Sequence, residues 1–160
     1  MEIEIRLADT RDVDVLVEFN RRLAVETEAK QLDVDTLRPG VLRVLEDSRL
    51  GRYFVATSDG RVVGQLLITF EWSDWRNGLI WWLQSVYVER ESRRHGVFRG
   101  LFAHVQEIAT RESALGLRLY VENENDVALR TYRSLGMVDA SYRVFELLPL
   151  EDSRGETEKE

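Results

Sequence analysis

The chain has 160 residues, the size of one compact domain, and its 44% hydrophobic and 32% charged residues form an ordinary globular composition. It has no cysteine and two histidines, which excludes a disulfide scaffold, a thiolate metal site and a cysteine nucleophile and argues against any resident metal. A net charge of -7 and a pI near 5.0 argue against nucleic-acid binding, and no apolar run approaches the ~18 residues of a membrane span. We therefore expect one cytoplasmic domain over residues 1–150, with neither nucleic-acid nor membrane partners, and an acidic, disordered tail over residues 151–160.

The first half of the chain predicts a strand, two helices and an antiparallel meander. Apolar and charged residues alternate at the start, and helical spacing then follows a capping residue, Asp9 or Thr10. An Asp-Gly turn between two β-rich runs is a strong hairpin signal, and a long apolar run comes after it. The expected elements are a strand at 3–7, a helix from about residue 10, a helix at about 35–47, and strands at 53–56, 62–70 and 79–88.

The second half of the chain changes to alternating helices and strands. The expected elements are a helix with apolar residues at 97, 101, 105 and 108, a buried strand at 116–121, a helix at 127–135 and a last strand at 142–148. A helix that connects two strands of one sheet is a crossover, and a crossover makes those two strands parallel. The sequence therefore predicts the α/β class with a mixed sheet.

The segment from Gln84 to Leu101 combines the end of a strand, a short loop and the start of a helix. No acidic residue lies between Arg93 and Arg99, and Gly96 stands just before the helix. A glycine lets an anion approach the backbone, and the N–H groups and positive dipole end of the first helical turn point toward it. A P-loop requires Gly-Lys-Ser/Thr and a dinucleotide fingerprint requires three glycines, and neither is present here. The segment therefore predicts a phosphate site of another kind.

Two motifs in this chain resemble those of the GNAT (Gcn5-related) N-acetyltransferase superfamily. The run Arg93-Arg94-His95-Gly96-Val97-Phe98 is similar to its pyrophosphate loop, Arg/Gln-x-x-Gly-x-Gly/Ala. The run from Asn125 to Met137 resembles its Asn-x-x-Ala-x-x-x-Tyr-x-x-x-Gly-Phe helix, in register at Asn125, Ala128, Tyr132 and Gly136. The resemblance covers residues 3–148. It implies a mixed, mostly antiparallel sheet of six to seven strands, splayed between strands 4 and 5, flanked by about four helices, with coenzyme A in the cleft.

The resemblance also implies a role for each residue of these motifs. The end of the fourth strand would pair with the pantetheine arm, and backbone N–H groups of the next loop would hold the pyrophosphate, with Arg93 and Arg99 as its best side-chain ligands. Asn125 would bind near the pantetheine or position its helix, and Tyr132 would be the catalytic residue that protonates the leaving thiolate. The expected cofactor-binding residues are Val86, Tyr87, Val88, Arg93, Arg94, His95, Gly96, Val97, Phe98, Arg99, Gly100 and Asn125.

The acceptor side of the site is less specific. Acids cluster between residues 26 and 35, where the family places segments that contact the acceptor, and they suit a cationic amine. Glu26 or Glu28 can also serve as the catalytic base, and a solvated helix end is the alternative for both. Gln84, polar within an apolar strand, and Trp72, in a turn-rich loop, are the acceptor-binding candidates.

These features together lead to two hypotheses about function. The first is an acetyl-CoA-dependent N-acetyltransferase that moves an acetyl group directly to a primary amine of a small molecule or peptide, with acetyl-CoA as co-substrate and no metal. The alternative is a module of the same fold that binds acyl-CoA as a sensor or regulator without turnover. A homodimer is the oligomeric state that the resemblance allows.

Overall fold

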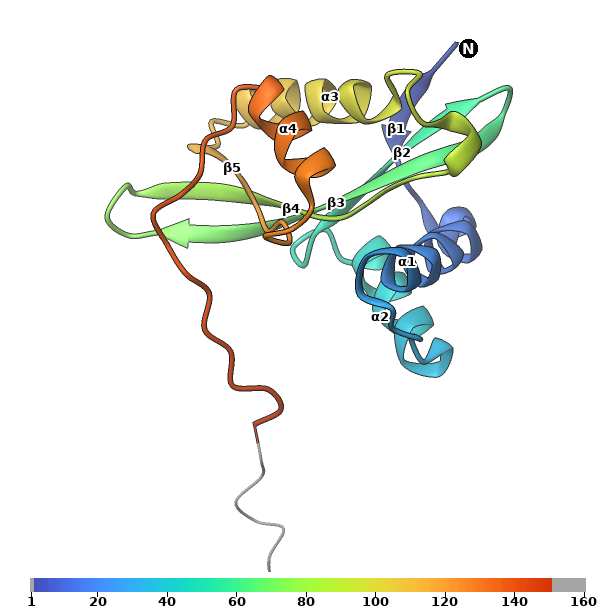
Figure 1. The fold of residues 1–160 in the computed structure, drawn as a ribbon, viewed down its shortest axis with the longest axis horizontal. Helices are drawn as coiled ribbons and strands as arrows, with labels where there is room; N and C mark the ends of the chain where they lie inside the picture. The colour runs from blue at the N-terminus through green and yellow to red at the C-terminus, as the bar shows by residue number, and fades with distance from the viewer. Residues whose placement is uncertain (1, 151–160) are drawn as a thin grey trace, which may run out of the picture. The chain divides into compact units, whose positions relative to one another are not determined.

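The computed structural model describes residues 2–150 (Figure 1). The chain divides into two compact units, residues 1–124 and 125–160. The tail predicted at residues 151–160 lies outside the described residues.

The first unit is built on a five-stranded mixed sheet in residues 2–124. Its strands are β1 (Glu4–Leu7), β2 (Arg52–Ser58), β3 (Arg61–Ser73), β4 (Gly78–Val88) and β5 (Gly116–Leu119), in the spatial order β1-β2-β3-β4-β5. Neighbouring strands from β1 to β4 are antiparallel to each other, and β5 is parallel to β4. The mixed, mostly antiparallel sheet is confirmed, but the described residues form five strands where six to seven were expected.

The sheet opens between β4 and β5, as expected. Pairing between these two strands runs only from Ile80 to Leu83, whereas β3 stays paired with β4 as far as Val88. Residues 84–88 of β4 therefore extend past β5 with a strand on one side only.

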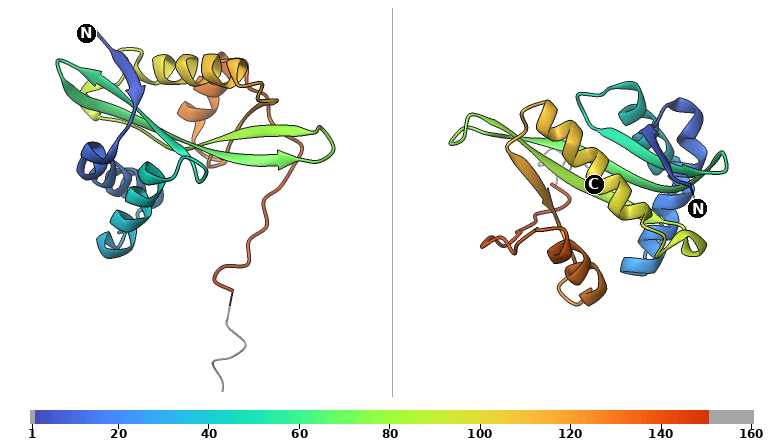
Figure 2. Two further views of the ribbon diagram at one scale, coloured as in Figure 1. Left: turned by 180° about the vertical axis from the view of Figure 1, so that it is seen from behind. Right: turned by 90° about the horizontal axis from the view of Figure 1, so that it is seen from above.

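Helices cover both faces of this sheet (Figure 1). The helices α1 (Val13–Glu28) and α2 (Val34–Glu46) lie on one face, and α3 (Val97–Arg111) lies across the strands on the other (Figure 2, right). On the first face, Leu16 and Val41 pack with Tyr53 and Leu67 of the sheet. Full burial of such large apolar side chains stabilises the fold by about 1.5–3 kcal/mol each. The two helical layers therefore hold β4 between them.

The second unit is described over residues 125–150 and contains one helix, α4 (Asp126–Ser134). The Asn125 side chain caps this helix, because its Oδ1 accepts a hydrogen bond from the Ala128 N–H at 3.1 Å. Gly136 follows the helix with a φ of +87°, the left-handed conformation that commonly ends helices.

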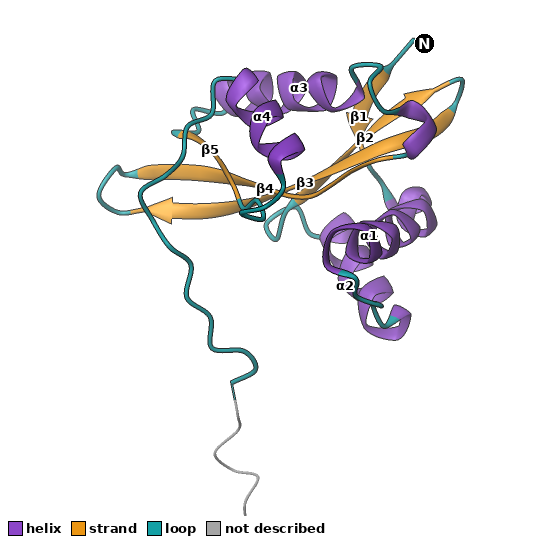
Figure 3. Ribbon diagram, viewed as in Figure 1, coloured by secondary structure: helices purple, strands orange, loops and turns teal. Residues whose placement is uncertain are grey.

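The strand predicted at 142–148 is wrong. Residues 138–150 form neither strand nor helix (Figure 3), and Tyr142 and Phe145 are 73% and 90% exposed. The alternating apolar pattern favours an extended backbone, but a strand also needs a neighbour that pairs with its N–H and C=O groups. None of the described residues pairs with this segment as a strand.

Candidate active site

A β-bulge interrupts β4 where the sheet opens. Gln65 of β3 lies opposite Tyr87 and Leu67 lies opposite Gln84, so Ser85 and Val86 together face one residue of β3. Ser85 has a φ of +50°, a left-handed conformation that costs a residue with a Cβ about 1–2 kcal/mol. Neighbouring groups must therefore hold the backbone of this bulge.

Buried polar side chains from three elements meet at this bulge. Gln65 is 0% exposed, and its Nε2 donates to the Ser85 carbonyl at 3.0 Å. The Tyr53 hydroxyl makes a polar contact with the Ser85 side chain, and Asn20 Nδ2 of α1 donates to Tyr53 Oη at 3.2 Å. We call Asn20, Tyr53 and Gln65 the bulge brace. The sequence analysis missed all three, although a glutamine inside the apolar run 62–70 was a signal for Gln65.

The loop after β4 leads into an N-terminus of α3 that is suited to an anion. Gly96 precedes the helix with a φ of +81°, no side chain caps the helix, and its first turn contains no acid. Gly100 donates its N–H to the Gly96 carbonyl at 2.9 Å, so the N–H groups of residues 97–99 precede the first helical hydrogen bond. A Cβ at Gly96 would meet no atom within 4 Å, which shows that the backbone there is approachable. The N–H groups of a first helical turn, together with the positive end of the helix dipole, are suited to bind phosphate.

A second glycine, which the sequence analysis did not single out, brings α3 close to the sheet. A Cβ built on Gly64 of β3 would lie 2.9 Å from Val97 Cγ1 and 3.3 Å from the Tyr87 carbonyl oxygen. Any larger residue would push the first turn of α3 away from the strand. Gly64 therefore helps to set the position of the predicted phosphate site relative to β4.

Arg93, which is predicted to bind the pyrophosphate, forms an ion pair with Glu26 of α1. Arg93 Nη2 donates to Glu26 Oε2 at 2.7 Å, and Arg93 Nε donates to the Val88 carbonyl at 2.8 Å. Tyr87 Oη donates to Glu26 Oε1 at 3.1 Å, and the Arg93 guanidinium stacks 5.4 Å from the centre of the Tyr87 ring. Arg93 therefore ties the end of β4 to α1.

The partners of Glu26 also determine its charge. Burial opposes its ionisation, but hydrogen bonds from Arg93 and Tyr87 and the charge of Arg90 outweigh burial, so the pKa of Glu26 lies below its ordinary value.

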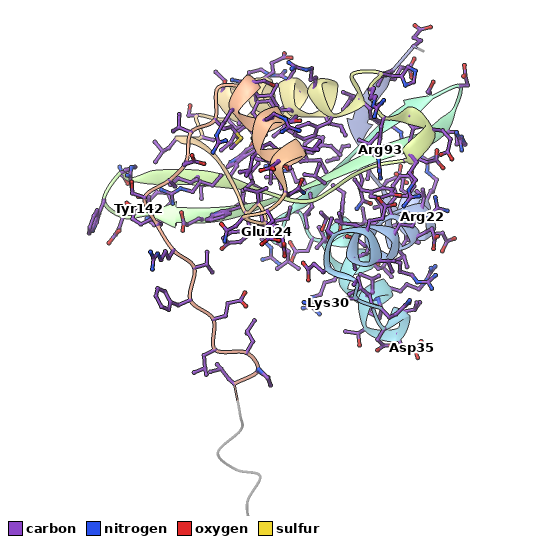
Figure 4. All side chains as sticks on the ribbon, in the orientation of Figure 1. Arg22, Lys30, Asp35, Arg93, Glu124 and Tyr142 are labelled. Carbon is purple, nitrogen blue, oxygen red and sulfur yellow. The ribbon has the colours of Figure 1, made fainter. Side chains whose placement is uncertain are left out.

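Glu26 also lines a pocket of about 250 Å³ together with Arg22, Tyr87, Arg90 and Glu91. Arg22 and Arg93 are labelled in Figure 4. The pocket contains two arginines and two glutamates, so its lining carries no net charge to attract a cation.

The structure does not bring the other acceptor-side candidates together. Glu28 pairs with Lys30 at 2.7 Å, and Asp33 caps α2 by accepting from the Asp35 N–H. Gln84 of β4 is paired with Leu67 of β3, and Trp72 lies five residues after Leu67 along β3. Because side chains alternate between the two faces of a sheet, Gln84 and Trp72 lie on opposite faces. That separation is roughly 17 Å at about 3.4 Å per residue.

The catalytic candidate of the second unit is Tyr132, which lies on α4 and is half-buried. Burial raises the pKa of its hydroxyl, which therefore stays protonated at neutral pH. Tyr132 is chemically able to donate a proton.

Residues 2–150 contain neither a cluster of metal ligands nor a helix that could span a membrane. No three His, Cys, Asp or Glu side chains gather there as metal ligands. None of the helices in that range is both long enough and apolar enough to cross a membrane.

A mixed sheet that opens beside β4 and leads into a helix start with no acid in its first turn agrees with the fold that the sequence motifs indicated. The sequence model of the Acetyltransferase (GNAT) family matches residues 18–137. The chain belongs to this family.

Individual relatives agree with this assignment. The chain is 48% identical to a possible acetyltransferase from Clostridium difficile 630, whose crystal structure matches with a TM-score of 0.85 over 92% of this chain and 97% of that chain. A predicted acetyltransferase with acetyl-CoA from Clostridium acetobutylicum shares the fold, with 19% identity and a TM-score of 0.76 over 92% of this chain and 97% of that one. Thialysine N-epsilon-acetyltransferase from Bos taurus is 35% identical over 78 residues, which are 49% of this chain and 45% of the bovine protein. The match thus spans less than half of that bovine relative.

Proposed function

We propose that this protein is an acetyl-CoA-dependent N-acetyltransferase that moves an acetyl group directly to a primary amine of a small molecule or peptide. The observation that carries the proposal is the succession of the bulged, open end of β4 and the uncapped start of α3. Membership of the Acetyltransferase (GNAT) family supports it. The chain has no cysteine, so a route through a cysteine-bound acetyl group is excluded.

Residues of the first unit are suited to hold acetyl-CoA. The N–H groups of residues 97–99 and the exposed Arg94 would bind the pyrophosphate, since no acid in the first turn of α3 opposes its charge. The backbone of residues 86–88 lies beyond the last β5 pair and would bind the pantetheine arm as a strand would. Arg93, held by Glu26, would support this edge of β4 and would not bind phosphate itself.

Acetyl-CoA supplies an acetyl thioester, whose C–S bond breaks as the acceptor nitrogen forms its bond to the carbonyl carbon. The Val86 N–H would stabilise the negative charge that develops on the carbonyl oxygen. The Tyr132 hydroxyl would give its proton to the leaving thiolate and recover one from water. The acceptor ammonium would first give a proton to water, because the lowered pKa of Glu26 makes that carboxylate a weak base, and the nitrogen would release a second proton to water once its bond to carbon has formed.

The proposal is tested by the release of coenzyme A thiol from acetyl-CoA in the presence of candidate amines. The chain contributes no thiol of its own, so a thiol reagent reports coenzyme A alone. Thialysine and lysine come first because the bovine relative is named for thialysine, followed by diamines and peptide amines. We expect amine-dependent release with at least one of them. Acetyl-CoA binding in calorimetry without release from any amine would favour the sensor alternative.

The role of Tyr132 is tested by Tyr132→Phe. We expect acetyl-CoA affinity to stay at the parental value and turnover to fall about 10²-fold, within the range of general acid catalysis. Tyr142→Phe, at a tyrosine that is 73% exposed in the same unit, is the matched control and should behave as the parent. Parental turnover in Tyr132→Phe, measured where chemistry limits the rate, would remove Tyr132 from the mechanism.

A further inference from the structure

Gln65 is an unusual residue for its place in the fold. It lies in the middle of β3, completely buried, with apolar neighbours along the strand on both sides. Its Nε2 donates to the Ser85 carbonyl, and its Oε1 is buried with no hydrogen-bond partner in residues 2–150. A buried, unpaired carbonyl oxygen lowers stability, so the contribution of this amide to stability does not account for its presence.

The one bond that Gln65 makes is directed at the most strained point of β4. Ser85 is the only residue of the described β4 with a positive φ, and no glycine there relieves it. The carbonyl that Gln65 holds belongs to the peptide unit whose N–H is that of Val86. The orientation of the Val86 N–H therefore depends directly on the hydrogen bond from Gln65.

We propose that Gln65 is a positioning residue for acyl transfer, which holds the Ser85–Val86 peptide of the bulge in the orientation that the transfer requires. This inference rests on the proposed function, in which the Val86 N–H stabilises the developing oxyanion. Tyr53 and Asn20 hold the Ser85 side chain from the α1 face, and Gln65 holds its carbonyl. The brace thus fixes both the side chain and the backbone of one strained residue.

The main test is Gln65→Met, which keeps the length of the side chain and removes the donor. We expect kcat to fall about tenfold to a hundredfold, which is no more than the roughly 10²-fold cost of a 1 Å misplacement, because the variant displaces the Val86 N–H and does not remove it. The KM for acetyl-CoA should change less than about threefold, because Gln65 donates its hydrogen bond to Ser85 and not to the predicted phosphate loop. Amide hydrogen exchange at residues 85–86 should become faster. Gln106→Met, on the exposed face of α3, is the matched control and should leave all three quantities unchanged.

A second variant, Gln65→Glu, separates the hydrogen bond from packing. Burial raises the pKa of a glutamate at this position, and the protonated carboxyl can donate to the Ser85 carbonyl as the amide does. We expect turnover near the parental value at low pH and a loss of turnover as the pH rises through that raised pKa. The pH profile of the parent should lack this decrease. This variant also decides the matter if Gln65→Met does not fold.

Failure of the positioning role of Gln65 can be distinguished from failure of the proposed function. Parental kcat and parental exchange in a folded Gln65→Met, or a Gln65→Glu pH profile equal to that of the parent, would overturn the positioning role. If the parent transfers acetyl to no amine, the proposed function fails. Exchange at residues 85–86 still tests the brace in that case, because faster exchange in Gln65→Met supports it and unchanged exchange overturns it.

Discussion

The two halves of β4 both pair with β3 on one side, and they differ in what lies on the other side and in the contacts that hold them. Residues 80–83 are paired with both β3 and β5, and Trp81 and Leu83 are almost completely buried. Residues 84–88 have a strand on one side only, contain a bulge, and are held by polar contacts from Gln65, Tyr53 and Arg93. Apolar packing thus stabilises the first half, whereas specific hydrogen bonds shape the second half for binding.

The largest effect that separates the two halves is expected from Trp81→Ala. Trp81 is 1% exposed, packs edge-on against Phe70 at 5.5 Å and lies under the Arg52 guanidinium. Truncation should lower the free energy of unfolding by about 3–5 kcal/mol, as measured by urea unfolding. Trp75→Ala is the control, since Trp75 is 90% exposed and should change stability by less than about 0.5 kcal/mol. Equal effects in the two variants would show that burial of Trp81 does not stabilise the first half of β4.

The next effect concerns acetyl-CoA binding at the start of α3, which follows the open half of β4 in the chain. Gly96→Asp places a carboxylate where the pyrophosphate is expected, and we predict a loss of acetyl-CoA affinity of about a hundredfold, equal to about 2.7 kcal/mol, by titration calorimetry. Gly96→Ala is the control for the positive φ alone, since a Cβ there meets no other atom. It should weaken binding much less. If both variants bind as the parent does, the phosphate site is not at this helix start.

A smaller effect is expected from Glu26→Gln, which removes the ion pair that ties β4 to α1. Because the folded-state pKa of Glu26 is lowered, its contribution to stability is complete above its ordinary pKa of 4.5 and is lost as the pH falls through the lowered value. The parent should exceed the variant by about 0.5–1 kcal/mol at pH 7, and the difference should shrink toward pH 3. A difference that grows on acidification would contradict the lowered pKa.

The same variant separates two roles for Glu26. If Glu26 were the general base, Glu26→Gln would abolish the acidic limb of the pH profile for turnover. We expect that limb to persist, because a carboxylate held by two arginines is already ionised well below neutral pH.

The smallest effect is expected from Ser85→Gly. Glycine adopts the positive φ without strain but loses the polar contact of the Ser85 side chain with Tyr53. The two changes oppose each other, so unfolding free energy should move by less than about 1 kcal/mol in either direction. A loss of several kcal/mol would show that the Tyr53 contact, and not the Gln65 contact, holds the bulge.

The parts of this molecule that short-range chemistry determines were predictable from the sequence. The hairpin between β2 and β3 turns at Asp59 and Gly60, which both have positive φ, as an Asp-Gly pair between β-rich runs predicts. The start of α3 at Gly96 follows from the same kind of local signal. The strand expected at 142–148 failed because alternation alone supplies no pairing partner.

The site was harder to predict, because its key contacts join residues that are distant in the chain. Arg93 and Glu26 are 67 residues apart, so nothing local indicated that this arginine would be paired away from the phosphate loop. The bulge at Ser85 has no glycine or turn signal, and the side chain that donates to its carbonyl, Gln65, lies 20 residues earlier in the chain. Hydrogen bonds between strands and helices become visible only once the register of the sheet is known.

The tryptophans of this protein have a consequence for spectroscopy. All four lie between residues 72 and 82, in the β3–β4 hairpin and its turn. Trp81 is almost fully buried and Trp75 almost fully exposed, so their emission maxima should differ, and unfolding of the hairpin should shift the first toward longer wavelength. Intrinsic fluorescence therefore reports the tightly packed end of β4 and is nearly blind to the bulge. If its unfolding curve coincides with the curve from far-UV circular dichroism, the two ends of β4 unfold as one cooperative unit.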